Sequence, residues 1–178
     1  MVTKLYGLRR QRSSHAVVAT CDITEQSIVL QPPVLTYVQR FRQILPFSSE
    51  TGGQLFGTVS VDVVNVESAT GPYLGDERSR YRYRSNPGAA QTAIEQHAKQ
   101  GLLYLGEWHT HAEDHPNASS LDVDAMRRLI ANSRLNSSAL LMLIVGRDKN
   151  VNGLALFTTT SSGSEQWALS SAPIEKTT

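Results

Sequence analysis

One run of apolar residues restricts the possible folds of this chain more than any other feature. It covers seven consecutive residues, from Ala139 to Val145. An amphipathic helix or a half-exposed strand would interrupt such a run with polar residues at a regular interval, so we predict a strand that is buried on both faces. No apolar run in the chain approaches the roughly 18–20 residues that a membrane-spanning helix requires.

Strand and helix patterns alternate through the rest of the sequence. Strands are predicted by β-branched or apolar segments bounded by turn residues, at residues 15–22, 27–30, 54–59, 61–69, 102–108 and 154–160. Helices are predicted from Pro33 to just before Pro46, from Asn86 to about Gln100, and from Ser119 or Ser120 onward. We expect one α/β (α+β) domain over residues 1–178, with its core at about 25–160 and flexible ends at 1–14 and 162–178.

The spacing of apolar residues indicates which face of each helix is buried. In the first helix the apolar positions are Val34, Tyr37, Val38, Phe41 and Ile44. In the third helix they are Leu121, Ala125, Met126, Leu129 and Ile130. We expect both sets to lie in the core, together with Trp108 and Trp167.

The composition excludes several classes of protein. The formal net charge of the 178 residues is +1, which argues against bulk electrostatic binding to nucleic acid or to an anionic membrane. Cys21 is the single cysteine, so the chain forms no internal disulfide and no thiolate zinc cluster. We expect Cys21 to be a small buried hydrophobic residue, and the protein to be soluble and cytoplasmic, with no nucleic-acid or membrane partner.

Two histidines at the end of one predicted strand indicate a metal site. Residues two apart on a strand point to the same face, so His109 and His111 project together, with Cα atoms roughly 6.6 Å apart. Two imidazoles placed in this way can share one cation. A catalytic zinc takes three protein ligands and keeps its fourth position for water. The candidates for the third ligand are Glu113, Asp114, His115 and Asp122.

Ser119 and Asp122 support two interpretations. Ser-x-x-Asp before an apolar run matches a helix capping box, in which the helix dipole also favours the acid. Taken alone, the pattern indicates a cap more readily than a metal ligand. The first turn of a helix is nevertheless a rigid place from which to hold a metal. His115, by contrast, is typical of a solvated loop histidine.

The combined spacing resembles the JAMM motif of the JAB/MPN metalloproteases. In this motif His109-x-His111 is followed, after seven residues, by Ser119-x-x-Asp122. Further upstream, Glu50-Thr-Gly-Gly resembles the glutamate element of that family, in which a Glu precedes paired glycines on a strand. The order of the predicted helices and strands is also similar.

The resemblance covers most of residues 25–160 and implies both a fold and a chemistry. The implied fold is MPN/JAB-like, with a curved mixed β-sheet flanked by about three helices. The implied cofactor is one Zn²⁺ per chain, held by His109, His111 and Asp122. The remaining two motif residues would be catalytic. The glutamate would take a proton from the attacking water and pass it to the leaving amine, and the serine would stabilise the oxyanion.

The resemblance also implies a substrate class. Members of the family cleave an amide or isopeptide bond after the C-terminal tail of ubiquitin or a ubiquitin-like protein. The stretch that begins at Leu105 is similar to bacterial JAB enzymes of anti-phage operons that carry ubiquitin-like conjugation machinery. Residues 70–80 and 133–138 leave little room for insertions, which favours recognition of an extended tail. Ala112 and Ala118 stand where the family often has proline, a departure that affects the loop and not the ligands.

Glu107 competes with Glu50 for the role of general base. It lies two residues before His109, so on a regular strand it faces the same way, and spacing alone favours it. We prefer Glu50 because it precedes the paired glycines. We expect Glu107 to support the site from behind the ligands or to pair with an arginine.

Arginines alternate with tyrosines over residues 78–84, a period-2 pattern that predicts a single half-exposed strand. Alternating arginines are typical of a solvated sheet face, and they also protect an edge strand. A functional interpretation is that Arg78, Arg80, Arg82 and Arg84 guide an incoming tail, which could pair as a further strand.

Two other functions fit parts of the sequence. The segment from His109 to His115 nearly matches the His-x-His-x-Asp-His signature of metallo-β-lactamase-like hydrolases, but that fold needs further histidines downstream and none follows His115. A non-catalytic MPN scaffold is the second alternative. Scaffold members have usually lost the histidines or the glutamate, whereas this chain keeps all five motif residues.

Overall fold

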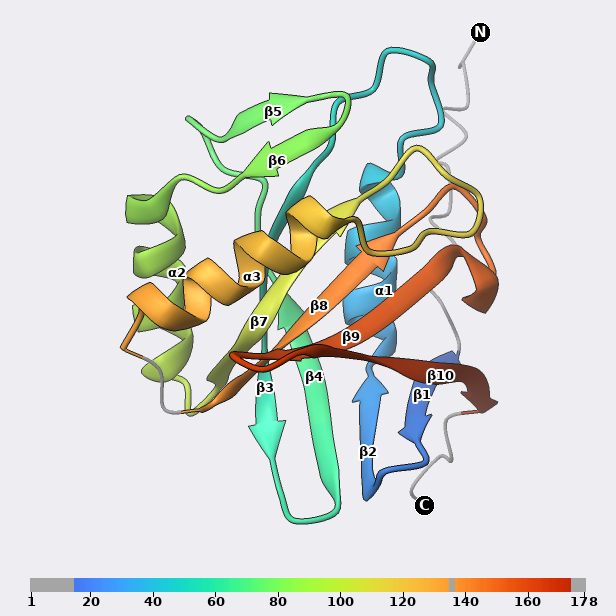
Figure 1. Cartoon of the computed structure of the whole chain (residues 1–178), viewed down its shortest axis with the longest axis vertical. Helices are drawn as coiled ribbons and strands as arrows, with labels where there is room; N and C mark the ends of the chain where they lie inside the picture. The colour runs from blue at the N-terminus through green and yellow to red at the C-terminus, as the bar shows by residue number, and fades with distance from the viewer. Residues whose placement is uncertain (1–14, 135–136, 174–178) are drawn as a thin grey trace, which may run out of the picture.

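The strands of the protein form a curved mixed sheet that closes into a barrel (Figure 1). The computed structural model describes residues 15–134 and 137–173. The barrel strands follow one another in space as β1-β10-β9-β8-β7-β3-β4-β2, and β2–β4 and β7–β8 are parallel pairs. Their bounds are β1 His15–Cys21, β2 Thr24–Leu30, β3 Gly52–Val59, β4 Val63–Ala69, β7 Leu103–Thr110, β8 Ala139–Val145, β9 Leu154–Thr160 and β10 Ser164–Pro173.

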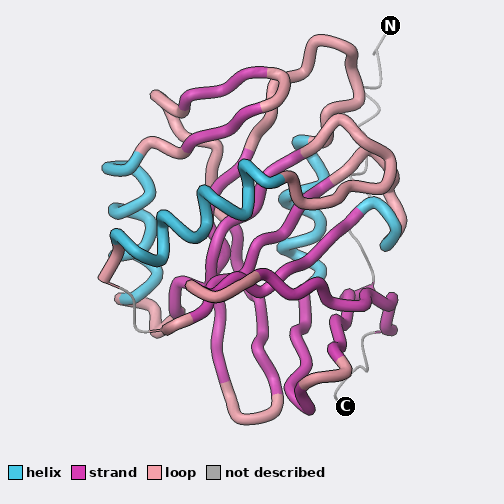
Figure 2. Tube along the Cα trace, viewed as in Figure 1, coloured by secondary structure: helices cyan, strands magenta, loops and turns pink. Residues whose placement is uncertain are grey.

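Within the described residues, three α-helices and one separate hairpin accompany the barrel. The helices are α1 Pro32–Val38, α2 Pro87–Ala98 and α3 Ser120–Asn132, with short 3-10 turns at η1 Gln39–Phe41 and η2 Val151–Gly153. The hairpin pairs β5 Glu77–Ser79 with β6 Arg82–Arg84. Figure 2 shows α2 and α3 on the outside of the barrel, while the hairpin stands apart from it. None of the described helices combines the length and apolar character needed to cross a membrane.

Strand β8 is buried on both faces, as its apolar run predicts. Alternate side chains from Leu141 to Val145 join the main hydrophobic cluster, which contains residues of all eight barrel strands and of α1 and therefore fills the interior. The other side chains of the run, those of Leu140, Met142 and Ile144, join a second cluster to which α3 contributes Met126. The predicted bounds of β8 and β9 match the observed ones, and Trp108 and Trp167 lie in the core as expected.

The buried faces of two helices are shorter than their apolar spacing predicts. The first helical segment ends at Phe41, since Arg42 leaves the helical conformation with φ −52° and ψ 138°, and Ile44 beyond it is 65% exposed. In α3, Met126 is buried but Leu121 is 66% exposed. The spacing of apolar residues identifies the buried face of a helix. It does not show where the helix ends, or which of its turns lie beyond the surface that it packs against.

Strand β10 occupies part of the C-terminal segment that we expected to be flexible. It pairs antiparallel with both β1 and β9, and these contacts close the sheet that the sequence predicted only as curved. Trp167 is buried, and its indole N–H donates to Thr158 Oγ1 at 2.8 Å. Closure leaves the main sheet without an edge strand. The predicted flexibility of 1–14 and 174–178 lies outside the described residues.

A bulge in β7 allows the strand to pass close to β8. Gly106 lies opposite Leu55, while Tyr104 lies opposite Phe56, so Leu105 is the extra residue. Gly106 has a φ of +146°, which L residues with side chains rarely adopt. A Cβ at this position would lie 2.6 Å from the backbone nitrogen of Leu141.

We expect Gly106→Ala to lower the free energy of unfolding by roughly 3 kcal/mol or more, because it combines backbone strain with a backbone collision. Urea denaturation monitored by tryptophan fluorescence measures the change. Gly163→Ala is the matched control, since a Cβ there meets nothing within 4 Å. Equal midpoints for the two variants would contradict the role given to Gly106.

Candidate active site

The end of β7 places two histidines side by side. His109 belongs to β7 and lies between Gly52 of β3 and Ile144 of β8. His111 follows the strand directly, and its backbone N–H continues the ladder by donating to Val145 O at 3.0 Å. Both residues are buried, with 9% and 8% of their surface exposed. The strand geometry predicted from the His-x-His spacing is therefore present.

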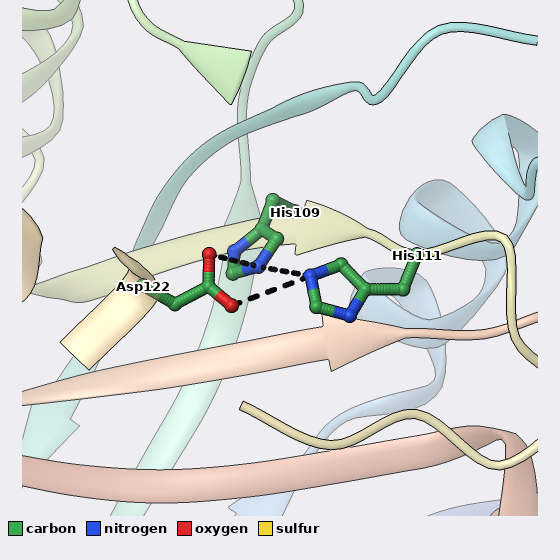
Figure 3. Close-up of side chains that lie close together, drawn as sticks. All are labelled: His109, His111 and Asp122. Carbon is green, nitrogen blue, oxygen red and sulfur yellow. Dashed lines mark hydrogen bonds and ion pairs between the residues drawn. The ribbon is translucent and has the colours of Figure 1, made fainter. Parts of the chain in front are cut away.

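Asp122 completes a group of three possible metal ligands (Figure 3). The Nε2 atoms of His109 and His111 lie 3.1 Å apart. Each of them is 3.4 Å from an Asp122 oxygen, His109 from Oδ1 and His111 from Oδ2. A tetrahedral ion with bonds of about 2.0–2.1 Å holds its ligand atoms about 3.3 Å apart. One ligand atom from each of the three residues can be chosen so that all lie within 4.8 Å of one another, so the group could hold a zinc ion.

Asp122 also belongs to the capping box at the start of α3. Ser119 is the N-cap, and its Oγ accepts from the Asp122 N–H at 3.2 Å while Asp122 Oδ2 accepts from the Ser119 N–H at 2.8 Å. Burial raises the pKa of Asp122, but hydrogen bonds from His109, His111 and Ser119 lower it more. The resulting pKa lies well below the usual range of an aspartate. Asp122 is therefore held as a carboxylate, the form that binds a cation.

The structure separates the other candidates from the ligand group. Glu113 is 3.9 Å from Nδ1 of His111, on the side of the ring away from the group, and its side chain is 58% exposed. Asp114 forms an ion pair with Arg147 at 3.0 Å. His115 is exposed and lies 3.2 Å from the carbonyl oxygen of Asn152. The near match to the metallo-β-lactamase signature thus does not form a ligand set.

Glu50 lies just before β3, beside the histidines. Extending the β3–β7 register beyond the Gly52–His109 pair brings Glu50 opposite His111, and the hydrogen bond from Thr110 N–H to Thr51 O at 2.8 Å supports this alignment. Glu50 is 7% exposed. Burial raises the pKa of Glu50 to about 7, while His111 lowers it and neighbouring carboxylates raise it. A carboxyl with such a pKa can exchange protons near neutral pH.

The two glycines after Glu50 provide room for neighbouring segments. A Cβ on Gly52 would lie 2.6 Å from Cδ1 of Tyr83, whose ring packs over this position from β6. A Cβ on Gly53 would collide with the carbonyl group of Thr70. The paired glycines are therefore needed for close packing at the start of β3.

Glu107 is occupied by a hydrogen-bond network of its own. Tyr104 OH donates to Oε1 at 2.7 Å, and the Gln54 amide donates to both carboxylate oxygens at 3.2 Å. Burial raises its pKa to about 7 even though these hydrogen bonds lower it. Glu107 is bound by an amide and a phenol, and not by an arginine as one expectation had it. These contacts favour a supporting role.

The arginine-rich segment forms a hairpin and not the single strand predicted for residues 78–84. The chain turns at Arg80 and Tyr81, between β5 and β6. This arrangement brings Arg78 to the backbone of Glu50, with Nε donating to its carbonyl oxygen at 2.8 Å. The sequence did not predict the hairpin, because its turn contains none of the glycine, asparagine, aspartate or proline residues that mark hairpins.

A groove of about 830 Å³ leads to the candidate site. The hairpin forms one wall, α3 forms the other, and β7 contributes the floor. Glu50, His109 and Asp122 all line it. Arg82 and Arg84 lie on the hairpin wall. Exposed Leu121, at the start of α3, is part of the opposite wall.

Comparison with known proteins agrees with this geometry. A family model described as prokaryotic homologs of the JAB domain matches residues 42–159, so the chain belongs to the prokaryotic JAB family. The resemblance inferred from the sequence is thereby confirmed.

Two curated relatives show the same affiliation. A CD-NTase/cGAS isopeptidase of Pseudomonas aeruginosa is 40% identical over 117 residues, which are 62% of this chain and 73% of the relative. A protein of the same name from Vibrio cholerae is 32% identical over 129 residues, which are 71% and 80% of the two chains. Because both relatives are named isopeptidases, they support the assignment of this protein as a hydrolase.

The fold also has a solved counterpart. A solution structure of a protein from Desulfitobacterium hafniense superposes with a TM-score of 0.55 at 23% sequence identity, covering 77% of this chain and 87% of the other. This similarity concerns the fold alone. It agrees with the predicted α+β class with three helices and a curved mixed sheet, apart from the closure of that sheet into a barrel.

We expect the purified protein to bind one Zn²⁺ per chain, with a rise in melting temperature. His111→Ala and Asp122→Ala should each weaken binding by at least about 100-fold, because each removes one ligand of three. His115→Ala is the matched control and should retain the ion. Burial lowers the pKa of His111, but the carboxylates around it give a net upward shift, so protons should compete with zinc as the pH falls. Titration with a zinc indicator at two pH values measures both effects, and equal affinity in the Asp122 variant would exclude this residue as a ligand.

Proposed function

We propose that the protein is a zinc-dependent isopeptidase that cleaves after the C-terminal tail of a ubiquitin-like protein or of its conjugate. One observation carries the proposal. Two histidine nitrogens and an aspartate carboxylate converge closely enough to hold one metal ion, and the buried Glu50 lines the same groove. Membership of the prokaryotic JAB family and the isopeptidase relatives support it.

The proposed reaction needs a proton carrier beside the ligand group. Zinc bound there would polarise the scissile carbonyl and make water acidic enough to attack at neutral pH. Glu50 would take one proton from that water as the water oxygen adds to the carbonyl carbon. When the carbon–nitrogen bond breaks, Glu50 would return the proton to the departing amine. A carboxyl held out of bulk solvent, with its pKa near 7, suits both steps.

Ser119 is proposed to stabilise the negative charge on the carbonyl oxygen. The Ser119 hydroxyl donates to Asp122 Oδ2 at 2.7 Å, and the Oγ atom of Ser119 also accepts from the Asp122 N–H. To serve an oxyanion, the hydroxyl would rotate and redirect its proton. Such a rotation leaves the cap bond from Asp122 N–H in place, so the helix start would stay ordered.

The groove suggests how a tail reaches the site. An extended segment between β6 and α3 would lie over β7 and deliver its final carbonyl to the ligand group, and Arg82 and Arg84 would line its path. Because the relatives are named CD-NTase/cGAS isopeptidases, we propose that the conjugates include a CD-NTase. We propose that the protein acts in the cytoplasm. We propose also that its gene belongs to an anti-phage operon with ubiquitin-like conjugation machinery.

A non-catalytic scaffold is the alternative, and the geometry argues against it. A scaffold has no need for three converging ligand atoms or for a buried carboxyl beside them. Burying polar groups costs free energy unless they are paired or bind a metal. Their retention at the end of a groove therefore favours catalysis.

We expect the wild-type protein to cleave a ubiquitin-like fusion or a CD-NTase conjugate, and a zinc chelator to abolish cleavage. Glu50→Gln should lower kcat by about 10²–10⁴-fold, because an amide cannot carry the proton. Gel-based assays with quantified products measure these rates. Glu107→Gln is the matched control and should stay within about tenfold of the wild type. Full activity in the Glu50 variant would show that another residue is the base.

The pH profile should report the ionisation of Glu50. The general base works as a carboxylate, so kcat/KM should rise with pH as Glu50 loses its proton. Burial raises its pKa to about 7 in the metal-free protein, and a cation at the ligand group would lower it. The acidic limb should therefore have its midpoint at or below about pH 7. Steady-state rates from pH 5 to 9 test this, and a midpoint well above 7 would count against Glu50.

A further inference from the structure

The β5–β6 hairpin holds the backbone of Glu50 from both sides. The Glu50 N–H donates to Ser79 O at 2.7 Å, and the Glu50 carbonyl accepts from Arg78 Nε at 2.8 Å. A terminal nitrogen of Arg78 also donates to Thr51 Oγ1. Figure 1 shows the hairpin outside the barrel, beside the segment that leads into β3. Both backbone polar groups of Glu50 are thus bound by the hairpin and not by the barrel.

The hairpin is itself anchored to the rest of the protein. The Tyr83 ring packs over Gly52 and its hydroxyl donates to Asp76 Oδ2 at 3.1 Å. Asp76 also accepts from the backbone N–H groups of Tyr73 and Asn86, each at 2.7 Å. Asn86 is the N-cap of α2. The hairpin therefore has a fixed position from which Arg78 can act.

We propose that Arg78 is a positioning residue for Glu50. The proposal rests on the proposed function, in which Glu50 carries the proton. Glu50 lies two residues before the start of β3, and its own N–H and carbonyl bind the hairpin and not a strand of the barrel. The charged donor of Arg78 binds the Glu50 carbonyl, and such hydrogen bonds are about twice as strong as neutral ones. Arg78 thereby sets the direction in which the carboxyl points toward the ligand group.

Arg78 is suited to a clean test because it lies outside both hydrophobic clusters. We expect Arg78→Ala to lower kcat by about 10- to 100-fold, since a small displacement of a catalytic group has effects of this size. KM and zinc content should stay within about twofold of wild type. Arg78→Lys should recover part of the loss, because a lysine can reach one of the two acceptors but not both.

Arg80→Ala is the matched control. Arg80 is in the same hairpin, and the contact of its side chain is with the neighbouring Tyr81 hydroxyl, at 2.8 Å from Nε. This variant should keep the wild-type kcat, because Arg80 does not contact Glu50. An Arg78→Ala protein that matches it in kcat, or that changes KM alone, would overturn the positioning role.

Hydrogen exchange provides a readout that does not depend on activity. The Glu50 amide should exchange faster in Arg78→Ala than in the wild type or Arg80→Ala, because its bond to Ser79 is part of the same contact. Unchanged protection of this amide would refute the proposal. If the wild-type protein cleaves no tail, the proposed function fails, and the exchange result alone still decides whether Arg78 anchors Glu50.

Discussion

The antiparallel pairing of β3 with β7 is the contact on which the candidate site depends. It joins the segment that carries Glu50 to the strand that carries His109, although the two are distant in sequence. Thr51 and Thr110 secure the register, since each backbone N–H donates to the other residue, at 3.0 and 2.8 Å. A slip by one residue would turn every side chain of one strand to the opposite face and separate the carboxyl from the histidines.

Asp122 shows that a helix cap and a metal ligand need not be competing interpretations. The capping box orients the carboxylate before any ion arrives, with Oδ2 bound by the Ser119 N–H at 2.8 Å. The two histidines approach the same group from β7 at 3.4 Å. A ligand that is already ordered loses little conformational entropy on binding. The local sequence rule for starting a helix thus also prepares the metal site.

The parts of the structure that the sequence predicts well are those with strong local patterns. β8 and β9 are continuous or nearly continuous apolar runs, and the ligand residues follow a fixed spacing. Strand β10 escaped prediction because Trp167 is its one buried residue, so the alternation of buried and exposed positions is too weak to detect. The contact of Arg78 with Glu50 escaped it for another reason. No periodicity relates a hairpin to a distant loop, and only the folded arrangement brings them together.

The closure of the barrel has a consequence for the order in which the chain can fold. β1 begins at His15, but one of its two neighbours is β10, which ends at Pro173. A ribosome therefore releases the strands of the active site well before it releases the strand that seals the barrel. Pairing between such distant segments carries a high loop-closure entropy and is characteristic of slow folding. Until β10 arrives, β1 and β9 are open edges, and this interval is when the nascent protein is most exposed to pairing with other chains.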